Sequence, residues 1–404
     1  MDAIITQVQS LASNANEAGR KEVIGTLRNL QYAVETPNDT LNRFAGLNLQ
    51  IAGARIGVDL GIFSALHESK QPLSVEALAR KNGAAPELLD SPRLTSEGRN
   101  LRYLASVGQI KETSKDHFSS SSITATLADD NYQGGIHHFF DTVGPSIQEL
   151  PDFLAATNYQ NITESTKTPF NRAFDTELPA FVWFPSQPER FAHFQKVMTV
   201  QRAGAPIFIS TFQFKKELGN FQGKPVFVDV GGGFGNQAMA VLEAFPELSG
   251  KLILQDLPQT LEHVPAIDGI QVMAHNFFEP QVVKVMIYLK ELRCRTNIIS
   301  GAKFYYLRNI LHDWPDEKSV VILKNIISAM EPDSRILIDD KVLPNEKVHW
   351  QATQEDLTMM ATLGSKERTV EQLRVLMDSA GLEVLDIVQY TTSLNDSIIV
   401  AVPK

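Results

Sequence analysis

A histidine and two acidic residues near the predicted ends of successive strands are the side chains best suited to chemistry. His312 follows a strand predicted near 303–307. Asp340 follows the next predicted strand, and Glu367 precedes the helix after that. A His with a pKa of about 6.5 can take a proton from a hydroxyl group, and a carboxylate on its far ring nitrogen fixes the tautomer. A single His is more often structural, but these neighbours favour a general base with acidic partners.

A glycine-rich turn follows another predicted strand and opens a helix, which is typical of a cofactor site. Read as G-x-G-x-x-A, Gly233, Gly235 and Ala238 would bind a dinucleotide. Read as D-x-G-x-G-x-G, Asp229, Gly231, Gly233 and Gly235 fit the first motif of S-adenosylmethionine-dependent methyltransferases. Asp229 favours the second interpretation, because an acid suits an ammonium group and crowds a pyrophosphate. A glycine turn without a ligand stays open as a third interpretation.

Three further residues extend the predicted cofactor site. Asp256 ends the strand after the glycine turn and could accept both ribose hydroxyls of either cofactor. Trp314 can cover the face of an adenine ring, and Arg308 lies four residues before His312. In open α/β sheets such residues, beyond the carboxyl ends of the strands, are where ligands bind.

The elements that must position these residues divide the chain into three parts. From about 221 to 404, alternating strands and helices predict a parallel, doubly wound α/β sheet. Residues 1–128 predict helices with two short strands near 108–118, the pattern of a winged-helix wing. Residues 129–220 predict a helical, aromatic-rich segment in which Trp183 and Met198 line a flat apolar pocket, although core packing is the simpler interpretation for most of its aromatic residues.

Composition excludes several classes of protein. The 404 residues carry a formal charge of −10 and one Cys, so neither a disulfide within the chain nor a Cys-based zinc site is expected. Residues 1–110 contain 11 Lys+Arg and 11 Asp+Glu, which is too neutral for a DNA-reading helix. No signal sequence and no run of about 18 apolar residues is evident, so we expect a cytoplasmic protein without membrane or nucleic-acid partners.

At this point the sequence resembles the plant- and fungal-type small-molecule O-methyltransferases. The resemblance rests on motifs in family order, from about Asn42 to the C-terminus: LGIFSAL, LRYLASVGQI, VDVGGGFG, LQDLP, LRNILHDWPDE and GSKERT. It implies a Rossmann-like class I methyltransferase sheet with an N-terminal, mainly helical, winged-helix dimerisation domain. It also implies S-adenosyl-L-methionine as the cofactor, no metal, and a homodimer.

The resemblance assigns roles to individual residues. His312 becomes the general base, with Asp340 and Glu367 as its acidic partners. The implied cofactor and substrate contacts are Asp229, Gly231, Gly233, Asp256, Asn276, Phe277, Arg308 and Trp314 for the cofactor, and Trp183, Met198, Asp313 and Met359 for the substrate.

The chain departs from the family pattern in several places. Asp340 stands where the family often has Glu, and Asn276 where it often has Asp to accept from the adenine amino group; Asn276 can still accept through its carbonyl. Residues 281–300 and 90–100 interrupt motifs that are otherwise in register. We hypothesise that one or both are translated intron remnants or splice variants, and that 281–300 could impair cofactor binding.

Together these features predict an O-methyltransferase acting on a phenolic hydroxyl of an aromatic secondary metabolite. A phenol has a pKa near 10, so it needs a base at neutral pH. The alternatives are a catalytically impaired relative that serves as a partner or regulatory subunit, a nicotinamide-dependent oxidoreductase, and a family member that uses the cofactor for other chemistry.

Overall fold

The computed structural model describes residues 2–82, 96–201, 207–221, 225–283 and 301–404. They form two compact units. The first holds residues 1–14, 22–151 and 181–204, and the second holds 15–21, 152–180 and 205–404. The predicted boundaries at 128 and 220 stay predictions.

The first unit is mainly helical. Its helices are α1 (Asp2–Ser13), α2 (Glu17–Val34), α3 (Pro37–Asp59), α4 (Ile62–Glu68), α5 (Val75–Asn82), α6 (Ser96–Ser106), α7 (Ser122–Leu127), α8 (Asp130–His137), η2 (His138–Val143), α9 (Gly144–Ala156), α11 (Ala180–Trp183), η3 (Phe184–Ser186) and α12 (Pro188–Val200). Helix α3 begins at a capping box in which Thr36 and Asp39 satisfy each other's backbone N–H groups.

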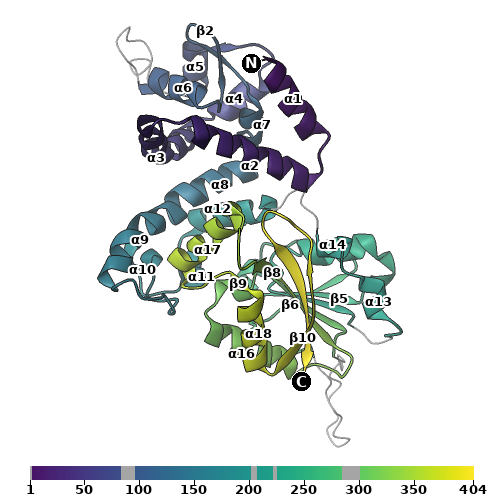
Figure 1. Ribbon diagram of the computed structural model, residues 1–404. Helices are drawn as coiled ribbons and strands as arrows, with labels where there is room; N and C mark the ends of the chain where they lie inside the picture. Colours follow the sequence, from purple (N-terminus) through teal and green to yellow (C-terminus); the bar gives the residue numbers. More distant parts are fainter. Residues whose placement is uncertain (1, 83–95, 202–206, 222–224, 284–300) are drawn as a thin grey trace, which may run out of the picture. The chain divides into compact units, whose positions relative to one another are not determined.

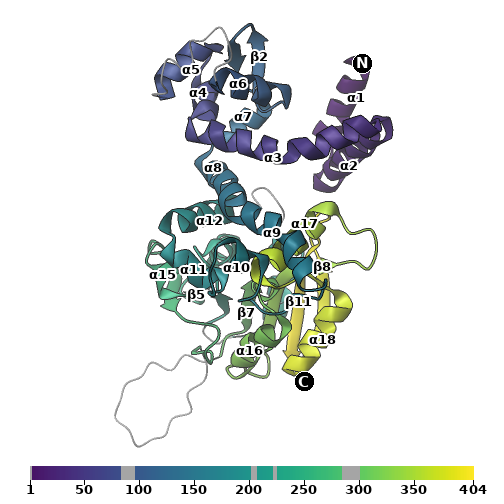
Figure 2. The same cartoon turned by 90° about the vertical axis from the view of Figure 1, so that its left-hand side faces the viewer.

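A small antiparallel sheet in the first unit forms the predicted wing. Its strands β1 (Leu73–Ser74), β2 (Lys111–Ser114) and β3 (His117–Ser119) pair in the order β1-β3-β2. The strands lie beside α6 and α7 (Figure 2). Phe118 of β3 is fully buried against Phe63 and Leu104, so the wing shares the apolar core of the helices around it.

The second unit is built on a mixed sheet. Its strands are β4 (Phe227–Val230), β5 (Leu252–Asp256), β6 (Ile270–Ala274), β7 (Phe304–Arg308), β8 (Arg335–Leu343), β9 (Arg368–Thr369), β10 (Leu382–Gln389) and β11 (Asp396–Pro403). The order is β10-β11-β8-β7-β4-β5-β6, and the five strands from β4 to β8 are parallel. This is the Rossmann-like class I methyltransferase sheet that the sequence predicted.

The prediction that the last strand continues the parallel series was wrong. Strand β11 is antiparallel to both β8 and β10. Only residues 390–395 connect β10 to β11, and so short a connection allows a hairpin but not a crossover to a parallel neighbour.

Helices cover both faces of the sheet. Helices α16 (Asp316–Ile327) and α18 (Val370–Ala380) lie on one side, and α13 (Phe214–Leu218) and α14 (Asn236–Ala244) lie on the other (Figure 1). The remaining helices of this unit are α10 (Pro169–Ala173), η4 (Phe208–Ser210), η5 (Pro246–Leu248), α15 (Pro258–Leu261), η6 (Leu311–Asp313) and α17 (Trp350–Leu363). Each face has its own apolar core, so the central strands are apolar on both sides.

Among the described helices, none alone has the length and apolar composition of a membrane span. The bent pair α3 and α4 passes that test together, by length and composition only.

The two segments predicted to interrupt the family pattern are partly described. Gln281 and Val283, at the start of 281–300, are buried, and Gln281 exchanges two amide hydrogen bonds of 2.9 Å with Gln255 of β5. The rest of that segment, 284–300, and residues 90–95 of the other lie outside the described residues. Their origin as splice remnants stays a hypothesis.

Candidate active site

His312 lies in the short turn η6 directly after β7. It is 6% exposed, and its Nδ1 is 2.9 Å from Oε1 of Glu367. Its Nε2 is 3.3 Å from Oδ1 of Asp313. Since Glu367 accepts from Nδ1, Nε2 is the ring nitrogen left to take a proton from a substrate, and Asp313 lies beside that nitrogen.

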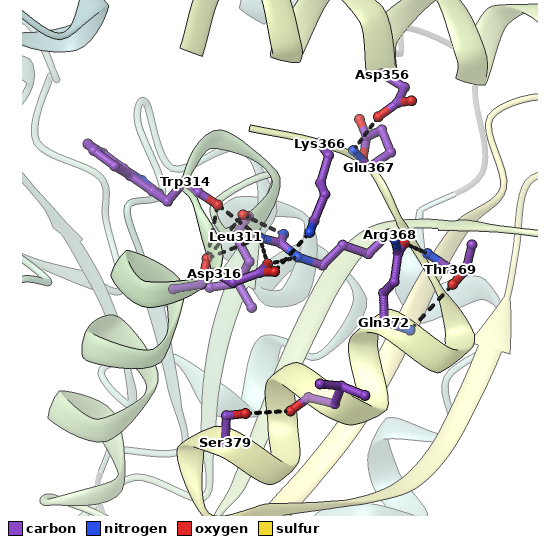
Figure 3. Close-up of polar contacts among 12 residues, drawn as sticks. Leu311, Trp314, Asp316, Asp356, Lys366, Glu367, Arg368, Thr369, Gln372 and Ser379 are labelled. Atoms are coloured by element: carbon purple, nitrogen blue, oxygen red, sulfur yellow. Dashed lines mark hydrogen bonds and ion pairs between the residues drawn. The ribbon is translucent and has the colours of Figure 1, made fainter. Parts of the chain in front are cut away.

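Arg368 helps to set the distance between His312 and Glu367. Its guanidinium donates to the carbonyls of Leu311 (2.7 Å) and Trp314 (2.9 Å), on either side of His312 (Figure 3). It also donates to Asp316, at 2.9 Å. Because Arg368 directly follows Glu367, these bonds tie the chain that carries the acid to the turn that carries the imidazole.

A helix holds the acid from the other side. The backbone N–H of Glu367 donates to Oδ1 of Asp356 in α17 at 2.8 Å (Figure 3). The Glu367 side chain is fully buried, so water does not compete for its contact with His312. The carboxylate is therefore held in one orientation by packing and hydrogen bonds from two elements.

Asp340, the other predicted partner of the base, is buried within β8, which continues to Leu343. Among the described residues, no hydrogen bond or ion pair joins it to His312, and its Oδ1 has no hydrogen-bond partner. Burial raises the pKa of Asp340 to about 6, although the charge of His312 opposes the rise. Its assigned catalytic role stays a prediction.

The electrostatics of the pair favour a charged imidazole. Burial opposes the charge, but Glu367 and then Asp313 outweigh it and raise the pKa of His312 to about 9. Burial works against the Glu367 carboxylate, yet His312 and Lys341 lower the pKa of Glu367 to about 2. Burial raises the pKa of Asp313 to about 7. Glu367 can therefore stabilise the imidazolium that forms when His312 takes a proton.

The glycine turn has the backbone shape that a cofactor loop needs. Gly231, Gly233 and Gly235 have φ angles of 69°, 57° and 79°, in the left-handed region that favours glycine. A Cβ at Gly231 would lie 2.7 Å from Cδ1 of Ile310, whereas a Cβ at Gly233 would face open space. The turn is thus packed against the protein on one side and open to a ligand on the other.

Two acids border this turn, and they do so differently. Asp256 accepts the N–H of Gly233 at 2.8 Å and of Leu257 at 2.7 Å, so its carboxylate lies against the open side of the turn. Asp229 is buried and accepts the N–H of Ala238 in α14 at 3.2 Å. Burial raises the pKa of Asp229 to about 7. Asp229 supports the loop from within, and its predicted contact with the ammonium group stays a prediction.

Two of the residues predicted to contact the cofactor, Trp314 and Phe277, lie in one aromatic cluster. Trp314 packs edge-to-face with Phe277 and Phe278, with ring centroids 6.1 and 4.7 Å apart. Oδ1 of Asn276 accepts the N–H of Phe278 at 3.1 Å, which orients this segment. These side chains and the open glycine turn have the chemistry to hold the adenosine part of the cofactor.

Arg308, at the end of β7, is paired with a buried acid of the neighbouring strand, β8. Its Nη1 lies 3.8 Å from Oδ2 of Asp339. The buried Asp339 carboxylate also accepts the hydroxyls of Tyr306 and Tyr390, the latter at 2.5 Å. Sequence reasoning missed Asp339 and both tyrosines. An acid inside an otherwise apolar strand is the signal that could have found them, because buried charges require partners.

The predicted substrate residues fall in both units. Asp313 and Met359, in η6 and α17, belong to the same unit as His312. Trp183, which is buried, and Met198, which is 37% exposed, belong to the other unit. The contact of all four with substrate stays a prediction. In the described part of the chain, no group of three or more His, Cys, Asp or Glu is placed to hold a metal ion.

Comparison with known proteins identifies the family of the chain. A family description of the O-methyltransferase domain matches residues 157–383. The chain is 39% identical to demethylsterigmatocystin 6-O-methyltransferase of Aspergillus parasiticus, over 100% of this chain and 98% of the relative. Two solved structures at 40% identity have a TM-score of 0.89. One is a complex of LepI with S-adenosylmethionine (SAM), covering 100% and 98% of the two chains, and the other is a pericyclic reaction enzyme, covering 100% and 99%.

The fold and the site therefore define a class I methyltransferase that uses S-adenosylmethionine. The chain belongs to the O-methyltransferase family. This result decides between the two cofactor interpretations of the glycine turn in favour of the methyl donor, and it leaves the nicotinamide alternative without support.

Proposed function

We propose that this enzyme methylates a phenolic hydroxyl of an aromatic secondary metabolite, with His312 as the general base. The observation that carries the proposal is the buried pair formed by Nδ1 of His312 and Oε1 of Glu367 at 2.9 Å. Small-molecule O-methylation by the relative from Aspergillus parasiticus, to judge by its name, supports the substrate class.

The residues divide the work as follows. When bound, S-adenosylmethionine supplies a methyl group on a positively charged sulfur, and the C–S bond breaks as the new C–O bond forms. Nε2 of His312 takes the hydroxyl proton, and Glu367 stabilises the resulting imidazolium. Asp256 and the glycine turn would hold the cofactor, and Trp314 would cover its adenine.

The raised pKa of His312 predicts how the reaction rate depends on pH. With its pKa raised to about 9, His312 holds a proton at neutral pH and must release it before it can act as a base. We therefore expect kcat/KM to rise with pH through the range 7 to 9.

His312→Gln tests the proposal. The variant should bind S-adenosylmethionine in calorimetry but lose methyl transfer to a panel of phenols, followed by labelled methyl donor and by mass shift. His263→Gln is the matched control, because His263 is exposed, follows the short helix α15, and places its Nδ1 3.1 Å from the carbonyl of Gln259 in that helix. Transfer at the wild-type rate by His312→Gln would rule out the base.

The same panel separates the alternatives. A partner or regulatory subunit would bind the cofactor and methylate nothing. Since a similar structure is a pericyclic reaction enzyme, isomerisation of a substrate without gain of a methyl group would point to that chemistry instead. The buried His312–Glu367 pair favours methylation, because removal of a hydroxyl proton is the step that needs a base.

We also propose that two copies of this chain associate through helices α1 to α3. No residue of α1 or α2 is buried, although both carry large apolar side chains. The exposed apolar residues of the three helices include Ile4, Leu11, Leu30, Val34, Leu41, Phe44, Leu47 and Leu49, each at least half exposed. Many exposed large apolar side chains on neighbouring elements of the chain are typical of an interface.

Light scattering of the purified protein tests the homodimer. The mass should be twice that of one chain, and Leu41→Glu with Phe44→Glu should give monomers. A wild-type monomer at micromolar concentration would refute it. A cytoplasmic location stays a prediction from the amino-acid sequence.

A further inference from the structure

A buried lysine lies behind the catalytic pair. Lys341, in β8, is 1% exposed. Its Nζ is 3.2 Å from Oε1 of Glu367 and 2.5 Å from Oε2 of Glu355 in α17. Removing an ammonium group from water is costly unless acids surround it, so this cation needs both carboxylates to stay charged.

One oxygen atom connects Lys341 to the proposed base, His312. Oε1 of Glu367 lies 2.9 Å from Nδ1 of His312 and 3.2 Å from Nζ of Lys341. A carboxylate oxygen that serves two cationic partners is held from two directions, and its charge is divided between them. Lys341 thus keeps Glu367 ionised and in place while it weakens the hold of Glu367 on the imidazole proton.

Glu355 competes with Glu367 for the charge of Lys341. It draws Lys341 away from Glu367, and its own side chain is a quarter exposed, whereas Glu367 is fully buried. Loss of Glu355 would leave Lys341 to Glu367 alone. The two substitutions, at Lys341 and at Glu355, should therefore change the base in opposite directions.

We propose that Lys341 is a positioning residue for methyl transfer: it holds Glu367 against His312 and offsets part of its charge, so that the imidazole can give up its proton and act as a base. The proposal rests on the proposed role of His312. Nothing in the family resemblance pointed to Lys341, since the sequence directed attention to Asp340 beside it.

Other charged groups surround the pair, and they are the same in every variant considered below. They come from five elements: Asp340 of β8, Asp313 of η6, Asp316 of α16, Asp356 of α17 and Arg368 of β9. The charge of Lys341 lowers the pKa of His312, against the rise that Glu367 and Asp313 cause.

The pH profile of kcat tests the proposal. Lys341→Met should move the acid limb to higher pH by one unit or more, which is a tenfold loss of activity at a fixed pH on that limb. Glu355→Gln should move the limb to lower pH. Lys341→Arg should restore the wild-type position in part. Lys303→Met is the matched control, because Lys303 is also buried but bonds the carbonyl of Asp333 at the opposite end of the sheet.

The state of the imidazole can be read without activity. The NMR signal of His312, assigned by its loss in His312→Gln, should titrate at higher pH in Lys341→Met and at lower pH in Glu355→Gln than in the wild type. If Lys341→Met fails to fold, Glu355→Gln and the double variant carry the test, and the double variant should titrate near the wild type.

Shifts in the same direction, or loss of activity with the limb unmoved, would overturn the role of Lys341 and leave only a structural part for it. An active His312→Gln would instead overturn the proposed base, whatever the lysine variants do. The two failures are therefore distinguishable.

Discussion

Glu367→Gln removes one negative charge from the active site at nearly constant side-chain size. Glu367 is the largest of the influences that raise the pKa of His312 from 6.5 to about 9. The difference, 9 − 6.5 = 2.5 units, corresponds to about 3 kcal/mol of stabilisation of the imidazolium. We expect the pKa of His312 in the variant to fall toward its ordinary value.

The effect on the rate follows from how far the proton has moved in the transition state. If it is about half transferred, about half of that energy is lost, which is a decrease in kcat of roughly 10- to 30-fold at high pH. The acid limb should move down by about two units at the same time. At pH 7 only about 1% of the wild-type imidazole is neutral, so the variant should lose far less activity there than above pH 9.

The assay is kcat and kcat/KM from pH 5.5 to 10 with a phenol accepted in the substrate panel. Glu371→Gln is the control, because Glu371 is an exposed residue in the first turn of α18. An acid limb that stays where the wild type has it would refute the reasoning, since Glu367 would then not set the basicity of His312.

Three further outcomes are expected. The pKa of His312 is raised in the folded state, so the charged imidazole contributes about 3 kcal/mol to the free energy of unfolding below pH 6.5, and this contribution is lost as the pH rises to about 9. In urea unfolding, the stability difference between the wild type and His312→Gln should therefore shrink over that range. A growing difference would contradict the prediction. Gly231 has a φ of 69°, and a Cβ there would lie 2.7 Å from Ile310, so Gly231→Ala should cost about 1–3 kcal/mol of stability and weaken SAM binding in calorimetry. The control Gly250→Ala has a similar φ, 72°, but open space around it, so it should cost about 1 kcal/mol and leave binding unchanged. Asp256→Asn should raise the Kd of SAM about tenfold, because the carboxylate expected to accept the ribose hydroxyls becomes a neutral amide. An unchanged Kd would remove Asp256 from the cofactor site.

Much of the fold could be predicted from local patterns. Apolar runs bounded by turn residues predicted strands over 225–230, 251–255, 303–307 and 335–339, and all four strands are present. The direction of the last strand could not be predicted in this way. Buried parallel and antiparallel strands have similar composition, and only the pairing of β11 with β8 and β10 decides the matter.

The site shows the same division. The order of strands brought His312, Asp340 and Glu367 to one edge of the sheet, and the sequence alone predicted all three. It did not predict that Glu367 contacts His312 while, in the described part of the chain, no hydrogen bond or ion pair joins Asp340 to that ring. The anchoring of the η6 turn by Arg368 decides that contact, and this anchoring depends on chain segments more than 50 residues apart.

Lys341 illustrates what a local signal can and cannot tell. A lysine inside the mostly apolar strand β8 is itself a signal, because such a charge must be paired when buried. Its partners come from α17 and from the chain before β9, which the sequence of the strand does not contain.

The amino-acid sequence by itself determined the class of fold and the glycine turn, favoured the methyl donor as cofactor and predicted His312 as the base, because these depend on residue type and short-range spacing. Only the tertiary structure decided which acid contacts the base, which lysine shares that acid, and which carboxylate faces the open side of the glycine turn. The physical reason is that hydrogen bonds and buried charges depend on distances of a few ångströms between side chains far apart in the chain, and packing alone sets those distances.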